Sequence, residues 1–439
     1  MTQESPEQEE RTTVGNNFIS NYPPFAYWTP EQLPAVEQVL SSPPIDDRPL
    51  GIYIHIPFCR KRCDFCYFKV YTDKNSSEIR RYLGAVVSEL DGLVKRPYLE
   101  GRKPRFIYFG GGTPSYLSAA QMRSIFASLR DRIDMSEVEE ITYECEPGTL
   151  SLAKIEALKE VGVTRLSLGV ENFNPEVLEL NNRAHRADEI HRTYGFARQV
   201  GFEAINIDLI AGMIGETEEN WADCIERTLK MAPDCVTVYQ MEVPYNTTMY
   251  KRMKESGTKV APVASWEAKR RWHAELFRQL FANGYHRSSA YTACRGEDTR
   301  FLYRDALWHG ADMLGLGVSS FSHLGGVHYQ NEPAFEGFIS RVLASEQPVS
   351  RTYETTAEER FIREFVLQVK QGELEFEYFI QKFGIDPRER YADILAKHEA
   401  DGFLIVDGGT LRATEDGLMQ IDRLLPPFFL DHHCGDRYV

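Results

Sequence analysis

The chain has 439 residues, with 50 Lys or Arg against 65 Asp or Glu and a formal net charge of −15. Its 42% hydrophobic and 26% charged residues exclude a largely disordered, collagen-like or low-complexity protein. It has no run of about 18 apolar residues and no basic, apolar leader, which argues against a membrane span and a signal peptide. Since the acidic balance also argues against a nucleic-acid partner, we expect a cytoplasmic protein of about two to four domains.

Residues 1–50 come before the regular part of the chain. Residues 1–17 are polar and acidic, which predicts a disordered tail. Residues 18–50 combine aromatic residues and prolines with one helical pattern. We expect this leader to pack against the surface of a domain.

Residues 51–265 alternate short β-rich runs with helical patterns. The β-rich runs occupy 51–58, 105–112, 140–147, 165–170, 204–210 and 235–243. The helical patterns occupy 77–94, 118–133, 151–162, 187–201 and 217–232. Because parallel strands need crossover connections, this alternation predicts an α/β fold built as an open, partial (β/α)6 barrel, with a doubly wound sheet as the alternative. In either fold the active centre lies at the C-terminal ends of the strands.

The rest of the chain divides into an accessory region, residues 266–350, and a C-terminal module with its tail, residues 351–439. The accessory region begins with a helix and contains a β-like stretch at 313–331. The C-terminal module combines helical patterns with a hairpin, which predicts a winged-helix-like α+β module. Such modules often bind DNA, but this one is not notably basic, so a structural or lid role is favoured.

Three of the eight cysteines lie close together directly after the first strand, as Cys59-x3-Cys63-x2-Cys66. Zinc with His55 as fourth ligand is disfavoured, because structural zinc sites usually draw two ligands from each of two segments. Three thiolates suit a [4Fe–4S] cluster whose fourth iron stays open to a small molecule. The basic residues between the first two cysteines either offset the charge of the cluster or form a solvated loop. The other cysteines are scattered at Cys145, Cys224, Cys235, Cys294 and Cys434.

The cysteine motif, with Phe65 before its last member, resembles the signature of radical S-adenosylmethionine (radical SAM) proteins. Over roughly residues 18–425, the segments YIHIPFC, FGGGTPSYLS, ECEP, RLSLGVENFN and NIDLIAG resemble the oxygen-independent coproporphyrinogen III oxidase family. That family includes haem chaperones and class C radical methyltransferases. The resemblance implies a radical SAM enzyme with a [4Fe–4S] cluster on Cys59, Cys63 and Cys66, one or two SAM molecules, and an electron donor such as flavodoxin or ferredoxin. We expect a monomer.

The resemblance also assigns roles at the ends of the strands. It places Tyr53 near the cluster, Arg183 on the carboxylate of SAM and Asp208 on the ribose. The other expected SAM contacts are Gly111, Gly112, Thr113, Glu144 and Glu171. A guanidinium fork suits a carboxylate, and glycines let the backbone approach a ligand closely. Glu144 and Glu242 are the candidate catalytic residues.

Two departures from the family bear on the reaction. The oxidases usually carry a further cysteine where this chain has Phe68, and the family's common glutamine is Glu171 here. These differences favour C-methylation or methylene transfer of the class C kind, on a large unsaturated small molecule such as a quinone, a natural product or a porphyrin. The first alternative is oxidative decarboxylation of coproporphyrinogen III, and the second is a haem chaperone.

Residues 285–331 are expected to line the substrate side, where arginines would favour a carboxylated substrate. The candidates are Tyr291, Arg300, Tyr303, Arg304, Trp308, His309, His323, His328, Tyr329 and Gln330. The last residues contain His432, His433 and Cys434, which could bind a metal adventitiously. We favour a flexible tail there, with a tail folded back as a plug as the alternative.

Overall fold

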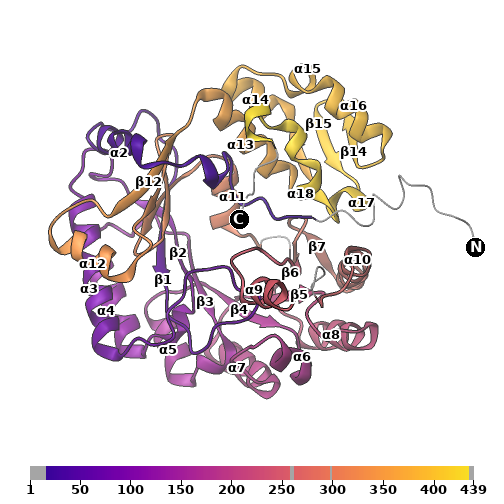
Figure 1. Cartoon of the computed structure of the whole chain (residues 1–439), viewed down its shortest axis with the longest axis horizontal. Helices are drawn as coiled ribbons and strands as arrows, with labels where there is room; N and C mark the ends of the chain where they lie inside the picture. The colour runs from indigo at the N-terminus through magenta and orange to yellow at the C-terminus, as the bar shows by residue number, and fades with distance from the viewer. Residues whose placement is uncertain (1–15, 258–261, 297–298, 435–439) are drawn as a thin grey trace, which may run out of the picture.

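The computed structural model describes residues 16–257, 262–296 and 299–434 (Figure 1). Six parallel strands form the centre of a twelve-stranded sheet and follow one another in sequence order. They are β1 (Leu50–Ile56), β2 (Pro104–Gly111), β3 (Glu140–Cys145), β4 (Arg165–Glu171), β5 (Ala204–Ala211) and β6 (Cys235–Gln240). The order never reverses, as it does in a doubly wound sheet. The prediction of a partial (β/α)6 barrel is therefore confirmed, and the doubly wound alternative is wrong.

Helices connect or follow the strands, and most of them lie along the outside of the sheet in Figure 1. They are α3 (Ser76–Leu93), α4 (Ala119–Arg130), α5 (Leu152–Glu160), α6 (Pro175–Leu180), α7 (Ala187–Val200), α8 (Glu218–Met231), α9 (Thr248–Glu255) and α10 (Trp266–Ala282). Their starts are fixed by side-chain caps, such as Asn75 and Glu78 on α3, which satisfy otherwise unpaired backbone N–H groups. The helical patterns predicted between the strands are present within a few residues.

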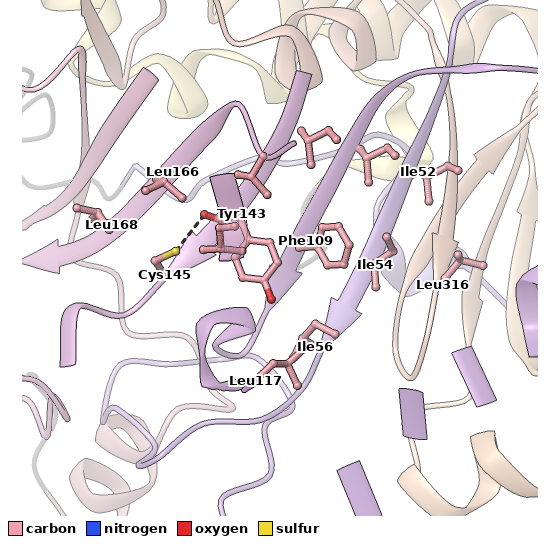
Figure 2. Packing of buried hydrophobic residues seen from close by; sticks show 14 of the residues in the cluster. Ile52, Ile54, Ile56, Phe109, Leu117, Tyr143, Cys145, Leu166, Leu168 and Leu316 are labelled. Carbon is pink, nitrogen blue, oxygen red and sulfur yellow. Dashed lines mark hydrogen bonds between the residues drawn. The ribbon is translucent and has the colours of Figure 1, made fainter. Parts of the chain in front are cut away.

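The alternation of side chains along the strands separates the core from the site. Ile52, Ile54 and Ile56 of β1 point to the helix side, where they join a buried cluster with Phe109 and Leu166 (Figure 2). Tyr53 and His55 consequently point to the opposite, inner face of the sheet. Polar groups can therefore gather inside the barrel while the outer face is close-packed.

Further strands extend the sheet at both edges. On the β1 side, β9 (Asp312–Leu316) pairs parallel with β1, and β10 (Phe321–Leu324), β11 (Val327–Asn331) and β12 (Val349–Glu354) follow as antiparallel strands. On the other side, β8 (Thr292–Arg295) and β7 (Tyr285–Arg287) follow β6. The helices of this region are α11 (Leu302–Trp308) and α12 (Phe335–Leu343). The β-like stretch predicted at 313–331 becomes three strands, and the edge strands β7 and β8 were not predicted.

The C-terminal module combines helices with a small three-stranded sheet of order β13-β15-β14. Its elements are α13 (Ala357–Val369), β13 (Glu373–Glu375), α14 (Phe376–Phe383), α15 (Pro387–Arg390), α16 (Ala392–Ala400), β14 (Leu404–Asp407), β15 (Thr410–Ala413), α17 (Glu415–Leu418) and α18 (Ile421–Leu424). The predicted helices and hairpin are present. Aromatic residues of α13 and α14 belong to a hydrophobic cluster that the module shares with the leader and with Phe106 of β2.

The leader runs between the barrel and the C-terminal module. Its first described residue is Asn16, so the tail predicted at 1–17 lies almost wholly outside the described residues. Lys370 Nζ donates to the carbonyl of Ile19 at 2.7 Å, and the N–H of Ile19 donates to Asp422 at 2.9 Å. Lys370 and Asp422 also form a fully buried ion pair at 2.7 Å. The leader also includes α2 (Leu33–Leu40), which packs against β12.

The described end of the chain packs against this leader. His433 is fully buried, and its Nδ1 lies 2.7 Å from the hydroxyl of Tyr22. The prediction of a flexible tail is therefore wrong for residues 431–434, because aromatic contacts with Tyr22 and Tyr27 hold them against the protein. Residues 435–439 lie outside the described part. Within that part, none of the helices combines the length and apolar character needed to cross a membrane.

We predict that Asp422→Asn lowers the free energy of unfolding by about 3–5 kcal/mol, because it leaves the buried ammonium of Lys370 without its counter-charge. Urea unfolding measures the loss. The matched control is Asp223→Asn, which breaks the exposed pair with Arg227 and should cost less than about 1 kcal/mol. Equal losses in the two variants would contradict the role given to the buried pair.

Candidate functional site

The three clustered cysteines lie in the loop that follows β1, at the C-terminal end of the strand. The loop is held by backbone hydrogen bonds, because the N–H of Cys59 donates to the carbonyl of Tyr71 at 3.1 Å and the N–H of Tyr71 donates back to Pro57 at 2.8 Å. The N–H of Cys66 donates to the carbonyl of Cys63 at 3.2 Å, which closes a tight turn. All three thiols are half-buried and face the same cavity.

The surroundings of the thiols favour a cluster over a single metal ion. Four ligands around one zinc ion place their sulfur atoms about 3.8 Å apart, from a Zn–S bond of about 2.3 Å. Within the described residues, the three sulfur atoms do not form a set whose members all lie within 4.8 Å of one another, with or without His55. The zinc alternative therefore does not fit this loop. Burial raises the pKa of Cys59 to about 12 and that of Cys66 to about 11, so both are neutral thiols until a metal displaces their protons.

Hydrogen-bond donors already reach two of the sulfur atoms. Thr113 Oγ1 donates to Cys59 Sγ and Arg183 Nη1 donates to Cys63 Sγ, both at 3.2 Å. Arg183 Nη2 also donates to the carbonyl of Gly169 at 2.7 Å, while its buried Nε has no partner among the described residues. A cation placed in this way is suited to an anionic group beside the cysteine loop.

Glu171 forms an ion pair with this arginine. Its carboxylate lies 3.4 Å from Arg183 Nη2. The residue has φ +62° and sits where the register between β4 and β5 shifts, an uncommon conformation for a residue other than glycine. The acid that departs from the family's glutamine thus holds Arg183 in the cavity wall.

The end of β2 is shaped by glycines. Gly111 has φ +111°, and a Cβ there would lie 2.5 Å from the ring of His55. A Cβ on Gly112 would lie within 3.0 Å of the backbone of Ile56 and Pro57. Glycine alone therefore lets the end of β2 approach the loop after β1 this closely.

Half-buried carboxylates line the cavity from β3 and from β5, with β4 between the two strands. Glu144 accepts hydrogen bonds from the hydroxyl of Tyr108 at 2.6 Å and the N–H of Gly111 at 3.1 Å. Asp208 accepts from Ser167 at 2.8 Å and from Asn206 at 3.0 Å. Such a group of partly desolvated acids is complementary to a cationic ligand.

The pKa values of these carboxyls reflect their burial. Desolvation raises the pKa of Glu144, Glu171 and Glu242 to about 7 in each case, and it also raises the pKa of Asp208. Neighbouring carboxylates add to the shifts of Glu144 and Glu171. Near neutral pH these groups can therefore gain or lose a proton as a ligand arrives.

A single cavity of about 1310 Å³ brings these groups together. Every site residue expected from the sequence lines it, namely Tyr53, Cys59, Cys63, Cys66, Gly111, Gly112, Thr113, Glu144, Glu171, Arg183, Asp208 and Glu242. From the substrate-side candidates it adds Tyr291, Tyr303, Arg304, Trp308, His323 and Gln330. Four of the substrate-side candidates are not part of the lining in the described structure, so the prediction is wrong for them: Arg300, His309, His328 and Tyr329.

Two residues of the cavity wall were not predicted from the sequence. Tyr108 stacks between Tyr53 and Tyr303, with ring centroids 5.9 and 4.2 Å away, and a period-two reading of β2 could have found it. Arg363 of α13 also lines the cavity, and no local motif marks it. Cys145 points to the packed side of β3, in agreement with its expected role in the core (Figure 2).

Comparison with known proteins matches both parts of this architecture. Residues 53–228 match the model of the radical SAM superfamily, and residues 356–419 match that of the HemN C-terminal domain. The chain is thus a radical SAM enzyme, of a superfamily that uses a [4Fe–4S] cluster and SAM. More specifically, it combines a radical SAM domain with a HemN C-terminal domain and is similar to oxygen-independent coproporphyrinogen III oxidases and haem chaperones.

Relatives align over most of the chain. The oxygen-independent coproporphyrinogen III oxidase of Escherichia coli (strain K12) is 27% identical over 409 residues, which cover 90% of this chain and 86% of the relative. The haem chaperone HemW of Bacillus subtilis (strain 168) is 28% identical over 335 residues, covering 76% and 86%. The solved structure of HemN from Escherichia coli superposes with a TM-score of 0.80 at 26% identity, covering 94% of this chain and 96% of that one.

We predict that Cys63→Ala removes most of the iron that the wild-type protein takes up on anaerobic reconstitution, about four irons per chain. The reason is that a thiolate ligand is lost from a loop that offers three. Iron analysis and the visible absorption of the cluster measure this. Cys145→Ala, which changes a buried cysteine outside the loop, should retain the iron. Equal iron in both variants would contradict the cluster site.

Proposed function

We propose that this protein catalyses the oxidative decarboxylation of a porphyrinogen that carries propionate side chains, as its relatives named oxygen-independent coproporphyrinogen III oxidases do. Each turn of this reaction removes one hydrogen atom, one CO₂ and one electron from a propionate side chain and leaves a vinyl group; the hydrogen atom would pass to the 5′-deoxyadenosyl radical and the electron to a separate electron acceptor. The observation that carries the proposal is the cavity, which runs from the cysteine loop to walls made by the leader, α11 and α13. The similarity to HemN spans all of these parts.

We further propose that Cys59, Cys63 and Cys66 hold the cluster. When bound, the cluster and SAM supply a 5′-deoxyadenosyl radical able to remove hydrogen from an unreactive carbon. The reductant is proposed to be a flavodoxin or ferredoxin, and the protein a monomer. Positioning the cofactor and excluding water are the tasks of the protein.

The chain's own residues match the charges of SAM. Arg183 binds the carboxylate of SAM, and Glu171 keeps that guanidinium in place. Glu144 and Asp208 bind the amino group and the ribose hydroxyls. The glycines at the end of β2, Gly111 and Gly112, admit the ligand close to the backbone, and Thr113 continues this wall. Tyr53 stacks on Tyr108 in the lining of the same cavity.

Glu242 is proposed to act on the substrate side. It follows β6 and accepts the N–H of Phe18 at 2.7 Å, so it also holds the leader at the cavity. Burial raises its pKa to about 7, which suits a group that exchanges a proton with a bound substrate.

The comparisons favour the porphyrinogen oxidase over the methyl transfer expected from the sequence. The named full-length relatives are coproporphyrinogen oxidases and haem chaperones. The departures at Phe68 and Glu171 thus have another explanation: Glu171 pairs with Arg183, and Phe68 packs against Tyr67 in a tilted arrangement at a centroid distance of 4.5 Å. A haem chaperone remains the second candidate, since Phe68 stands where the oxidases carry a cysteine.

The test is a product assay with the reconstituted, reduced protein, SAM and coproporphyrinogen III. The proposal expects 5′-deoxyadenosine together with CO₂ and a vinyl-bearing product. S-adenosylhomocysteine with a methylated product would establish the methyltransferase instead. Haem binding without SAM cleavage would establish the chaperone.

A second prediction concerns pH. Only the ionised form of Glu144 attracts the cationic SAM, so affinity should fall as the pH drops through the pKa of about 7. For one such group, the dissociation constant rises about tenfold from pH 8 to pH 6. Equilibrium binding with the reconstituted protein measures this.

The control for the pH prediction is Glu144→Gln, which removes the titrating group while SAM keeps its own titration. This variant should bind more weakly at pH 8 and show a pH dependence reduced by about the factor assigned to Glu144. The same pH dependence in both proteins would exclude Glu144 as the responsible group.

A further inference from the structure

Arg363 is a buried cation without a carboxylate partner. It belongs to α13 of the C-terminal module, is 6% exposed and lines the cavity. Its Nε donates to Asn21 Oδ1 at 2.7 Å, and its Nη1 donates to the carbonyl of Leu307 at 3.0 Å. In the described structure, no carboxylate lies within 4.0 Å of its guanidinium, and Nη2 has no hydrogen-bond acceptor.

The adjacent acid is already engaged. Glu364 forms an ion pair with Lys382 at 2.8 Å and accepts the hydroxyl of Tyr378 at 2.5 Å. Burial lowers the pKa of Arg363 to about 10, although the negative charge of Glu364 acts to raise it. An unpaired buried charge is costly unless a partner satisfies it, and here the open side of the guanidinium is the cavity.

Two other residues of the cavity lining also have polar side-chain atoms without hydrogen-bond partners among the described residues. His323 of β10 also lines the cavity, and the buried Nδ1 of its side chain has no hydrogen-bond partner among the described residues. Burial and the charge of Arg363 lower its pKa well below the ordinary value, so the ring is neutral and offers one N–H. Arg304 of α11 donates to Asp305 and Ser288, and its Nη1 is buried without an acceptor among the described residues.

We propose that Arg363, with His323 beside it and Arg304 in the lining of the same cavity, forms a subsite for a carboxylate of the substrate. Its task is to anchor an acidic side chain other than the one that reacts. A guanidinium with a free N–H edge is the side chain best suited to a carboxylate. The identity of the ligand rests on the proposed function, whereas the subsite itself requires only a carboxylated molecule in this cavity.

A purely structural role is the competing explanation, because Arg363 joins the leader to α11 through Asn21 and Leu307. The two roles differ in what they recognise. Loss of a subsite weakens binding of a free carboxylate more than binding of its ester. Loss of a purely structural contact weakens binding of every ligand of the cavity to the same extent. A comparison of acid and ester therefore separates them even if the variant is less stable.

The experiment measures binding of coproporphyrin III and of its tetramethyl ester to the reconstituted protein by fluorescence titration in one solvent. We expect Arg363→Gln to weaken binding of the acid by about tenfold to a hundredfold and binding of the ester by less than about twofold. Lys69→Gln is the matched control, since it removes a positive charge from an exposed residue of the same cavity. It should change both affinities by less than about threefold.

Equal weakening of acid and ester in Arg363→Gln, or no weakening of either, would overturn the subsite. Selective loss of the acid supports it, whatever product the enzyme makes from coproporphyrinogen III. A failure of the proposed reaction is thus seen in the product assay alone, and a failure of the subsite is seen in the binding ratio alone.

Discussion

Around the cavity, several polar and charged groups are withdrawn from water without a full set of partners in the described part of the protein. Three thiols offer an incomplete ligand set for a cluster of four irons. The carboxyls at the ends of β3, β4 and β6 have raised pKa values, and the guanidinium of Arg363 lacks a carboxylate. Metal ions would satisfy the thiols, and ligand groups of opposite charge would satisfy the carboxyls and the guanidinium.

Such a site needs a rigid frame, and the frame comes from three parts of the chain. The parallel strands pack their outer face tightly and so direct polar side chains inward (Figure 2). The leader closes one side of the cavity, and the backbone of Ile19 is hydrogen-bonded to the buried Lys370–Asp422 pair of the C-terminal module. The module therefore does more than cover the barrel, because it fixes the leader and contributes Arg363 to the cavity wall.

Local sequence patterns were sufficient to predict much of the fold and of the cysteine site. Strand and helix periodicity predicts the six central strands and their connections, and the spacing of the cysteines predicts a cluster rather than zinc. Arg363 and the edge strands β7 and β8 were missed, because they acquire their place through contacts between distant segments. The packing of His433 was missed for the same reason, since its partner Tyr22 is 411 residues away. The preference for methyl transfer relied on two single departures, Phe68 and Glu171, whose contacts only the structure reveals.

The central claim is that the loop after β1 holds a four-iron cluster with one iron left for SAM. Mössbauer spectroscopy of protein reconstituted with isotopically enriched iron tests it most directly. The account predicts that adding SAM changes the signal of one iron in four and leaves the other three unchanged. Four irons that respond alike, or a spectrum of a single isolated iron, would contradict it.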